Sequence, residues 1–347
     1  MELGKKIKQL RLRSGLTQEQ LAAKVGIGAQ SVSKWETAVA MPDISTLPLL
    51  AETFGVTIDE LFDLSTEQRM NRIENRMDVE EELPPDVFRE YEDFLKALLT
   101  EEQYKKRAQE LIAYLYWHRM NSYAQKVRRY AKEAIRTAPN EKSCQWMLNM
   151  AEGHAVWDWN VSNHKQAIDF YSELVQKNPD QRLPYLYLLD NLLADHRADE
   201  AEQVLGRLCR LPDLKPVFEP SYRAHIALAR FDAAAADAII EQMLREAPED
   251  SDCLFEGAQY YALKCDYDKA VDCYERAFAC DTMRPRYQDA LMGIADISEI
   301  RGDYARAADA CRRIVALLKN EWGMTEDLAL QQAEDRLRRM EELSRGK

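Results

Sequence analysis

The sequence predicts an all-α protein that contains two different kinds of helical unit. Helix-forming residues dominate its 347 positions, with only 12 glycines and 12 prolines. The first 64 residues divide into five short amphipathic segments, and much of the remainder repeats a pattern at intervals of 34 to 37 residues. We therefore expect a five-helix domain over residues 1–64, a charged linker with a short helix over 65–86, and a helical-repeat domain over 87–347.

Composition limits the class of protein. Hydrophobic residues make up 46% of the chain and charged residues 31%, as in folded globular proteins. No apolar run approaches the roughly 18 residues of a membrane span, and the N-terminus lacks the apolar core of a signal peptide. We expect a cytoplasmic protein that does not contact a membrane.

Neither the cysteines nor the histidines have the spacing of a reactive centre. The seven cysteines contain no Cys-x-x-Cys pair and fit buried apolar positions in a reducing compartment, with a redox-sensing thiol as the alternative. The five histidines lack metal-ligand spacing, and no phosphate loop or nucleophile motif is present. We predict no metal, no cofactor and no enzymatic activity.

Charge is distributed unevenly along the acidic chain. The formal net charge is −13, but residues 1–35 carry seven bases against two acids. Residues 36–64 carry six acids and no base, and residues 65–347 have a net charge of −12. A clustered basic face in an otherwise acidic protein is typical of phosphate binding.

Turn and capping residues define the first three helices. Gly15 ends the first helix, and Thr17 opens the second by forming a capping box with Gln20. Gly26 allows a tight turn into a third helix over residues 28–36. The inward apolar residues of these helices are expected to be Leu3, Ile7, Leu10, Leu21, Ala22, Val25, Val32 and Trp35.

Two further short helices complete this unit. The fourth begins at Pro42-Asp43 and ends at Gly55, and Thr57 and Glu60 form a capping box for the fifth. Five short helices with a glycine turn between the second and third describe a helix-turn-helix unit.

A known family carries the same residues at the same spacing. The string LRLRSGLTQEQLAAKVGIGAQSVSKWE, followed by PDISTLPLLAETFGVTIDELF, resembles the XRE (lambda-repressor-like) DNA-binding domain over residues 3–64, about a fifth of the chain. The resemblance implies that the third helix enters the major groove of double-stranded DNA. The DNA-binding residues it implies are Gln18, Gly28, Ala29, Gln30, Ser33, Lys34 and Lys6.

The implied roles of these residues differ. Gln30 would pair with adenine, and Lys34 would reach a guanine or a phosphate. Gln18 would touch a phosphate, as the equivalent glutamine of the family does. Arg11 would form an internal ion pair with Glu36, with direct DNA contact by Arg11 as the alternative.

This chain also departs from the family pattern. Gly28 and Ala29 stand where the family often has a serine followed by arginine or glutamine, and the loop over residues 37–41 lacks the usual basic residues. We therefore expect a weaker phosphate grip than usual. The alternative to DNA binding is a head that has decayed or been reused for contact with a protein.

The linker over residues 65–86 ends in two successive prolines. Met70, Ile73 and Met77 form a narrow apolar stripe on its short helix. The segment fits either a solvated spacer or a small dimer seam.

The remaining chain repeats a helical-hairpin pattern. Alanines recur at separations of 34, 35, 34 and 37 residues, at positions Ala167, Ala201, Ala236, Ala270 and Ala307. The pattern resembles the tetratricopeptide repeat, in which small residues let paired helices approach closely. It predicts an α-solenoid of about six hairpins, including a weaker one near 108–141, with an extra helix near 86–105 and a capping helix near 325–343.

Such a stack leaves a concave groove along the first helix of each hairpin. Aromatic, amide and charged side chains there would suit an extended peptide. The candidate groove residues are Tyr116, Arg119, Trp159, Asn160, Tyr187, Asp190, Tyr222, His225 and Gln259.

An XRE-like head joined to these repeats is similar in architecture to peptide-responsive bacterial regulators. It implies a transcription regulator, expected to be a homodimer, whose affinity for a DNA operator depends on a peptide or protein effector in the groove. The alternative is a repeat scaffold whose head binds DNA weakly or not at all.

Overall fold

A computed structural model describes most of the chain, over residues 2–62, 65–140, 142–153, 158–212 and 214–346. These ranges contain helices and no strand, which confirms the all-α prediction. The chain divides into two compact units, Met1–Lys126 and Val127–Lys347. No helix within the described ranges has both the length and the apolar character needed to cross a membrane.

The N-terminal part of unit 1 has the predicted sequence of short helices. They are α1 (Glu2–Arg13), α2 (Gln18–Val25), α3 (Ala29–Glu36), the 3-10 turn η1 (Ile44–Thr46), α4 (Leu47–Phe54) and α5 (Ile58–Leu61). We call residues 2–62 the head.

The fourth helix of the head differs from its prediction. It begins at Leu47 rather than at residues 42–43, because η1 precedes it. Asp43 caps that turn by accepting the backbone N–H of Ser45 at 2.9 Å. Pro48 then lies in the first turn of α4, the only part of a helix that tolerates a residue without an amide hydrogen.

Local capping fixes the helix-turn-helix geometry. The Thr17 hydroxyl accepts the Gln20 N–H at 3.2 Å, and the Gln20 side chain accepts the Thr17 N–H at 2.8 Å. Gly26 has a φ of 73°, in the left-handed region that favours glycine. Both features confirm the predicted capping box and turn.

One glycine allows α1 to pack directly against the end of α3. A Cβ atom on Gly4 would lie 2.1 Å from the carbonyl oxygen of Trp35, far inside van der Waals contact. The head core around this contact consists of the predicted inward residues of the first three helices, together with Leu50 and Leu61. The basic first helix and the third helix are therefore held as one rigid pair.

The rest of unit 1 is a second helical cluster. It contains α6 (Thr66–Val79), α7 (Pro85–Leu98) and the first part of α8 (Glu102–Thr137). The apolar stripe of Met70, Ile73 and Met77 is buried here against residues of α7 and α8. The stripe therefore packs against helices of its own chain. It acts neither as a solvated spacer nor as a dimer seam.

Helix α8 replaces the hairpin that the repeat pattern suggested near residues 108–141. It is one continuous helix of 36 residues. The reason is local, since no glycine or proline occurs between Glu102 and Thr137, and Pro139 is the first residue able to stop the helix. The division between the two units falls within α8.

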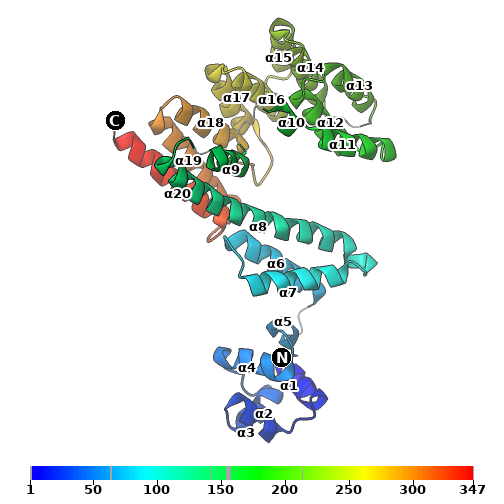
Figure 1. The fold of residues 1–347 in the computed structure, drawn as a ribbon, viewed down its shortest axis with the longest axis vertical. Helices are drawn as coiled ribbons and strands as arrows, with labels where there is room; N and C mark the ends of the chain where they lie inside the picture. The colour runs from blue at the N-terminus through cyan, green and yellow to red at the C-terminus, as the bar shows by residue number, and fades with distance from the viewer. Residues whose placement is uncertain (1, 63–64, 141, 154–157, 213, 347) are drawn as a thin grey trace. The chain divides into compact units, whose positions relative to one another are not determined.

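Unit 2 is a series of antiparallel helical pairs (Figure 1). After the last part of α8, its helices are α9 (Lys142–Glu152), α10 (Trp159–Ser162), α11 (Lys165–Lys177), α12 (Arg182–Ala194), α13 (Ala198–Leu208), α14 (Phe218–Ala229), α15 (Ala233–Glu246), α16 (Ser251–Leu263), α17 (Tyr267–Cys280), α18 (Asp289–Ile300), α19 (Tyr304–Asn320) and α20 (Leu328–Arg345).

Four of the five recurring alanines lie where paired helices meet, whereas Ala167 on α11 is only half-buried. Ala201, Ala236, Ala270 and Ala307 are completely buried, each in the second helix of a hairpin. A larger side chain there would push the helices apart. The pairs α12–α13, α14–α15, α16–α17 and α18–α19 therefore follow the predicted hairpin pattern, and α20 packs on α19 as the capping helix.

Candidate nucleic-acid interface and ligand cleft

Helix α3 has a buried face and an open face. Val32 and Trp35 point into the head core, whereas Gln30 and Lys34 are exposed on the other side. Ser33 is half-buried beside them. The helix thus presents an amide and an ammonium to solvent on a rigid support, and both groups can hydrogen-bond to base edges or phosphates.

The N-terminus of α3 is less well capped than that of α2. Gly28 is the N-cap residue and supplies no side-chain hydrogen bond, and Ala29 follows it half-buried. Gly28 is exposed, and a Cβ atom added there would meet no atom within 4 Å. The backbone can therefore approach another molecule closely at this point, but it offers no side chain to grip it.

A buried ion pair locks the head together. The Arg11 guanidinium donates to Glu36 through Nε at 2.5 Å and Nη2 at 3.0 Å, and its Nη1 donates to the Leu16 carbonyl at 2.8 Å. Gln18 adds a hydrogen bond from Nε2 to Glu36 at 2.8 Å. The structure therefore confirms the internal ion pair of Arg11 with Glu36, rather than an Arg11 side chain directed toward DNA.

The same contacts set the ionisation of Glu36. Burial alone would raise the pKa of its carboxyl, but the hydrogen bonds from Arg11 and Gln18 outweigh that effect and hold the pKa below its usual range. Glu36 is therefore a stable anion in the folded head. The Gln18 amide, which the family resemblance assigns to a phosphate, is oriented by this anion while its side chain stays partly accessible.

Basic residues lie on α1 as well as on α3. Lys5 and Lys8 are exposed, and Lys6 is half-buried. Because Gly4 seats α1 on the end of α3, these side chains belong to the same rigid body as Lys34. Six of the seven bases of residues 1–35 therefore lie on these two adjoining helices, and Lys24 lies on α2.

The loop after α3 is apolar and accessible, which distinguishes this head. Val39, Met41 and Ile44 are 73%, 50% and 82% exposed. Ala38 starts the loop with a φ of 59°. The loop supplies no cation, as expected from the sequence.

The predicted groove residues fall in both units. Tyr116 and Arg119 lie on α8 in unit 1, where the Arg119 guanidinium is 3.5 Å from the ring centre of Phe88 and the Tyr116 hydroxyl donates to Glu92. The other seven lie in unit 2. Trp159 and Asn160 are exposed on α10, so α10 carries two of the nine candidates away from the hairpin helices.

The remaining five lie on the first helices of successive hairpins. Tyr187 on α12 stacks on Tyr171 with ring centres 5.4 Å apart, and Gln259 on α16 is exposed. On α14, the His225 ring is edge-on to a tyrosine of α16, and its Nδ1 lies 2.9 Å from the Ser221 carbonyl oxygen. These side chains follow one another along the first helices of the stack.

Two of the predicted groove residues contact each other directly. The Tyr222 hydroxyl donates to the Asp190 carboxylate at 2.8 Å, which links α14 to α12. Neighbouring protein removes part of the hydration of Asp190 and raises the pKa of its carboxyl, although the side chain remains accessible.

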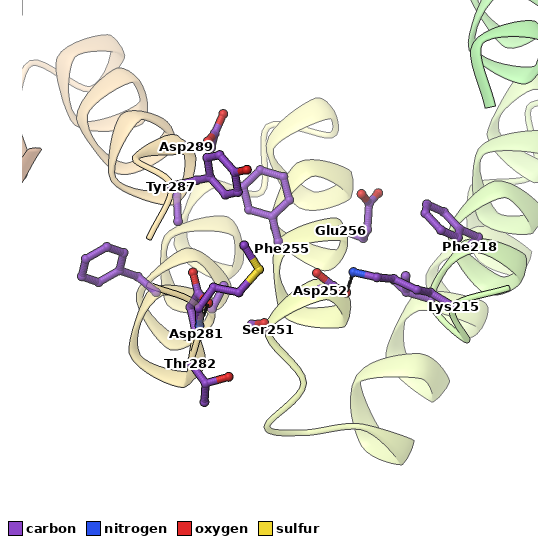
Figure 2. Close-up of a pocket in the computed structure, with 15 residues that line it drawn as sticks. Lys215, Phe218, Ser251, Asp252, Phe255, Glu256, Asp281, Thr282, Tyr287 and Asp289 are labelled. Carbon is purple, nitrogen blue, oxygen red and sulfur yellow. Dashed lines mark hydrogen bonds and ion pairs between the residues drawn. The ribbon is translucent and has the colours of Figure 1, made fainter. Parts of the chain in front are cut away.

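A cleft of unit 2 lies farther along the same first helices. A cavity of about 640 Å³ opens between the N-terminal parts of α14, α16 and α18 and the loop before α18. Its walls combine aromatic rings, such as Phe218 and Phe255, with the carboxylates of Asp252, Glu256 and Asp289 (Figure 2). This volume is typical of ligand-binding pockets.

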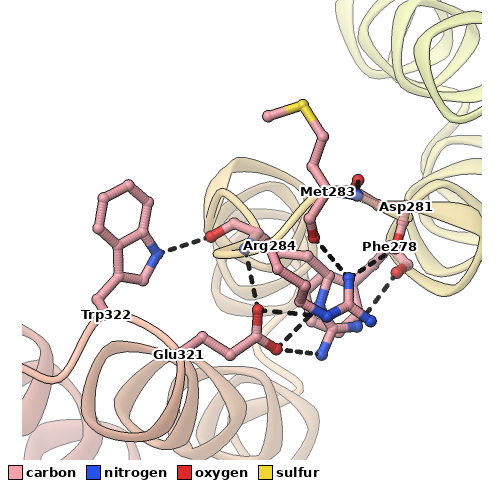
Figure 3. A network of polar contacts seen from close by, with 7 residues as sticks. Phe278, Asp281, Met283, Arg284, Glu321 and Trp322 are labelled. Carbon is pink, nitrogen blue, oxygen red and sulfur yellow. Dashed lines mark hydrogen bonds and ion pairs between the residues drawn. The ribbon is translucent and has the colours of Figure 1, made fainter.

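The loop over residues 281–288 forms one wall of this cleft and is anchored from α19. Glu321 accepts the Arg286 backbone N–H at 2.9 Å and two guanidinium N–H groups at 3.0 and 2.6 Å. The Trp322 indole N–H donates to the Arg286 carbonyl at 2.7 Å. Figure 3 shows this network, together with the Arg284 side chain bonded to carbonyls of its own loop. The wall is therefore preformed.

The prediction from sequence did not identify the residues that line this cleft. One signal was present, because the separation of 37 between Ala270 and Ala307 exceeds the others by two or three residues. The additional residues lie in the 281–288 loop. An enlarged interval in a repeat marks such a loop, but it does not reveal which side chains face it.

The cysteines differ in burial: Cys253, Cys273 and Cys311 are buried as predicted, but Cys265 is exposed. All seven cysteines are unpaired thiols, and burial raises the pKa of Cys253 to about 12. In the described part of the chain, no group of three or more histidine, cysteine and carboxylate side chains has the arrangement of a metal site.

Comparison with known proteins identifies the head. Residues 7–61 match the family model described as Helix-turn-helix. The HTH-type transcriptional activator BcrR of Enterococcus faecalis is 43% identical over 61 residues, which cover 18% of this chain and 30% of BcrR. The HTH-type transcriptional regulator ImmR of Bacillus subtilis is 38% identical over 61 residues, which cover 18% of this chain and 48% of ImmR.

These matches confirm the assignment of the head as an XRE-type helix-turn-helix domain. The chain spans less than half of the length of either curated relative.

Two solved structures align with most of the chain. PlcR of Bacillus thuringiensis, in complex with the peptide PapR7 and DNA, is 14% identical over 80% of this chain and 94% of PlcR, with a TM-score of 0.24. The apo form of the competence regulator ComR from Streptococcus vestibularis is 12% identical over 97% of both chains, with a TM-score of 0.26. At these values the likeness is distant.

Proposed function

We propose that the protein is a sequence-specific DNA-binding transcription regulator whose repeat domain binds a peptide or protein effector. In this proposal residues 1–64 bind the operator and residues 87–347 bind the effector. Residues 65–86 connect these two parts. The observation that carries it is the open face of α3, where Gln30 and Lys34 are exposed on a helix fixed by Trp35.

The DNA-binding step follows from the arrangement of the head. With α3 in the major groove, the Gln30 amide would make a bidentate contact with adenine, worth about 1–3 kcal/mol in base discrimination. Lys34 would bind a guanine or a phosphate. Gln18, at the start of α2, would donate its second N–H to a phosphate while the first remains on Glu36.

Further contacts are assigned to the flanks of α3. Ser33 would hydrogen-bond to the groove beside Lys34, and the open backbone at Gly28 and Ala29 would allow close approach to the sugar-phosphate chain. Lys6 and its neighbours on α1 would contribute backbone charge. The acidic remainder of the chain would repel DNA and so reduce non-specific coating.

We propose that the regulator acts as a homodimer, since two heads would read the two halves of a palindromic operator. An apolar stripe on the part of α8 that belongs to unit 1 supports self-association, because its side chains recur at helical spacing and are between 49% and 59% exposed. The stripe consists of Trp117, Met120 and Tyr123. Such a regulator would work in the bacterial cytoplasm, where the DNA is.

The effector would bind along the first helices of the hairpins. Five of the nine candidate groove residues lie on these helices, namely Tyr187, Asp190, Tyr222, His225 and Gln259, and the 640 Å³ cleft opens between the same helices. A bound peptide would change the affinity of the heads for DNA. The proposed role is therefore binding and switching rather than catalysis.

The test is selection of random duplex DNA by the full-length protein and by the Gln30→Ala, Lys34→Ala variant. We expect the wild-type protein to enrich a palindrome and the variant to lose it. A matched control removes the same residue types from α11, in Gln166→Ala, Lys165→Ala, and should select the same palindrome as the wild type. Failure of the wild-type protein to enrich any sequence at low salt would reject the proposal.

A specific observation favours a second candidate function, that of an interaction scaffold. The loop after α3 exposes Val39, Met41 and Ile44, which suit contact with a protein better than contact with phosphate. Replacing all three by serine would abolish partner binding in that case. In the regulator, the same change would leave the selected DNA sequence unaltered.

A further inference from the structure

We infer that the cleft between α14, α16 and α18 binds the cationic part of a short amphipathic peptide, that is, an ammonium or guanidinium group next to an aromatic or long aliphatic side chain. This inference rests on the proposed function, because it specifies which peptides the effector domain accepts. It comes from the charges, the apolar surface and the preformed wall of the cleft.

The charges of the cleft are not balanced within the protein. Lys215 is its only lining cation among the described residues, and it is already paired with Asp252 at 2.5 Å. Glu256, Asp281 and Asp289 also line the cleft, and none of them forms an ion pair with another described residue. Three carboxylates that line the cleft therefore have no ion-pair partner in the described part of the chain.

Hydrogen bonds orient two of these three acids. Glu256 accepts the Ser221 hydroxyl at 2.9 Å, and Asp281 accepts the Met283 backbone N–H at 2.8 Å. The remaining oxygens of these carboxylates are available to a ligand. A ligand that covered them without supplying positive charge would strip their hydration without compensation, so the cleft selects a cation.

Apolar surface surrounds the acids. Phe218 and Phe255 are half-buried in the walls, and Met283 and Tyr287 are 55% and 59% exposed at the rim (Figure 2). Aromatic faces also attract cations. An apolar side chain beside the positive group would bury these rings, and a simple amine or metal ion would not.

The cleft is also shaped before a ligand arrives. Arg286 and Glu321 fix the loop that carries Asp281 and Met283, and the Arg286 guanidinium covers the ring of Phe278 with its carbon 4.1 Å from the ring centre. A preformed wall reduces the ordering cost of binding. A volume of about 640 Å³ accommodates a few side chains rather than a folded domain.

A second cavity of unit 2 provides an internal contrast. It also has a volume of about 640 Å³ and lies between α13, α14 and α15. Its lining charges are balanced, because the two acids Glu202 and Asp232 face the two bases Arg223 and Arg230. Equal volume with balanced charge gives no preference for a cation, so the assignment is specific to the first cleft.

The test measures binding of defined heptapeptide mixtures to the full-length protein without DNA, by fluorescence anisotropy with a C-terminal dye. One mixture has a free N-terminal ammonium followed by phenylalanine and no basic residue. The other three are acetylated and carry an internal Arg-Phe, Glu-Phe or Arg-Ser pair. The first two separate the possible sources of positive charge, and the last two remove either the charge or the ring.

We expect at least one of the first two mixtures to bind about tenfold more tightly than the Glu-Phe mixture. The Arg-Ser mixture should bind more weakly than the Arg-Phe mixture. In Glu256→Gln, Asp289→Asn the preference for the cation should disappear, and in Asp289→Lys it should shift toward the Glu-Phe mixture. Asp309→Asn, on the exposed surface of α19, is the matched control and should behave as wild type.

The inference would be overturned if neither the free-ammonium mixture nor the Arg-Phe mixture bound more tightly than the Glu-Phe mixture, or if no mixture bound. A cation preference that survives in both Asp289 variants, with their thermal midpoints unchanged, would overturn it as well. The DNA selection described above is independent of this assay. If the protein selects no DNA sequence but prefers the cation, the proposed regulator is rejected and the cleft assignment stands. If it selects DNA but shows no cation preference, the cleft assignment is rejected and the regulator stands.

Discussion

The head and the repeat domain of unit 2 are both all-helical, but they are stabilised in different ways. In the head, each contact occurs once: the buried pair of Arg11 and Glu36, the close approach at Gly4, and a single small core. In unit 2 the same contact recurs, with Ala201, Ala236 and their counterparts filling the same position in successive hairpins.

The difference determines how far a local change spreads. A globular domain with one core loses its structure as a whole, whereas a stack of hairpins responds mainly in the altered repeat and its neighbours. Hydrogen exchange followed by mass spectrometry on the full-length chain separates these responses, because it reports on each helix. The five predictions below use it or equilibrium unfolding to test the contrast.

The largest effect is expected for Glu36→Met, which leaves the Arg11 guanidinium buried without a counter-charge. We expect the head to lose about 4 kcal/mol of stability, because unpaired buried charges are expensive. Exchange should accelerate throughout α1–α5 and remain unchanged in α12–α19. The double variant Arg11→Met, Glu36→Met removes both charges and should recover most of the loss. A double variant as unstable as the single one would contradict the ion-pair explanation.

The same pair predicts a pH dependence confined to the head. The pKa of Glu36 is lower in the folded state than in the unfolded chain, so its contribution is fully present above its unfolded value, about 4.3. It is lost as the pH falls through the lower folded value. Acidification should therefore weaken protection in α1–α5, and this part of the response should be absent from the double methionine variant.

A somewhat smaller effect is expected for Gly4→Ala. The added methyl would lie 2.1 Å from a backbone oxygen that cannot move aside without shifting α3. We expect a loss of about 3 kcal/mol in the head, measured by the exchange of amides in α1 and α3. A variant as stable as the wild type would show that α1 does not pack on α3 in this way.

Gly293→Ala is the corresponding change in unit 2. Its methyl would lie 2.5 Å from the ring of the buried Tyr274, a side chain that can adjust. Steric cost and the better helix propensity of alanine partly cancel, and we expect a net loss of about 1 kcal/mol. Protection should fall in α16–α19 only. A loss that reached the head would contradict the contrast between the two regions.

The smallest effect is expected for Gly28→Ser, at the N-cap of α3. The position has an extended backbone and open space, so a serine hydroxyl can cap the helix. We expect the head to gain about 0.3 kcal/mol, measured as a shift of the denaturant midpoint. A destabilisation larger than about 1 kcal/mol would mean that the bare glycine backbone is required by the fold itself.

The head could be predicted almost residue by residue, because its turns depend on particular side chains. Thr17 and Gln20 predict a capping box, and Gly26 predicts a left-handed turn. Both are present in the structure. The predicted start of α4 was wrong because Pro42-Asp43 resembles the start of a helix. The first turn of α4 in fact contains Pro48. Two proline signals within six residues compete, and tertiary packing decides between them.

In the repeat domain the period predicted the helices but not the site. Ala236 and Ala270 were identified because packing requires a small residue at a constant interval. The cleft depends on a loop whose position is set by Arg286 and Glu321, which are 35 residues apart. Pairing over such a distance leaves no local pattern, so Asp281 and Asp289 could not be recognised as neighbours of one cavity.

Helix α14 belongs to both apolar cores of the repeat domain. Val217, just before it, and Ala224 lie in the core that continues to α20, whereas Ile226 and Ala229 lie in the core shared with α12 and α13. Phe218, in its first turn, lines the cleft. Occupancy of the cleft should thus slow amide exchange on both sides of α14, in α12 and α13 as well as in α16 to α18.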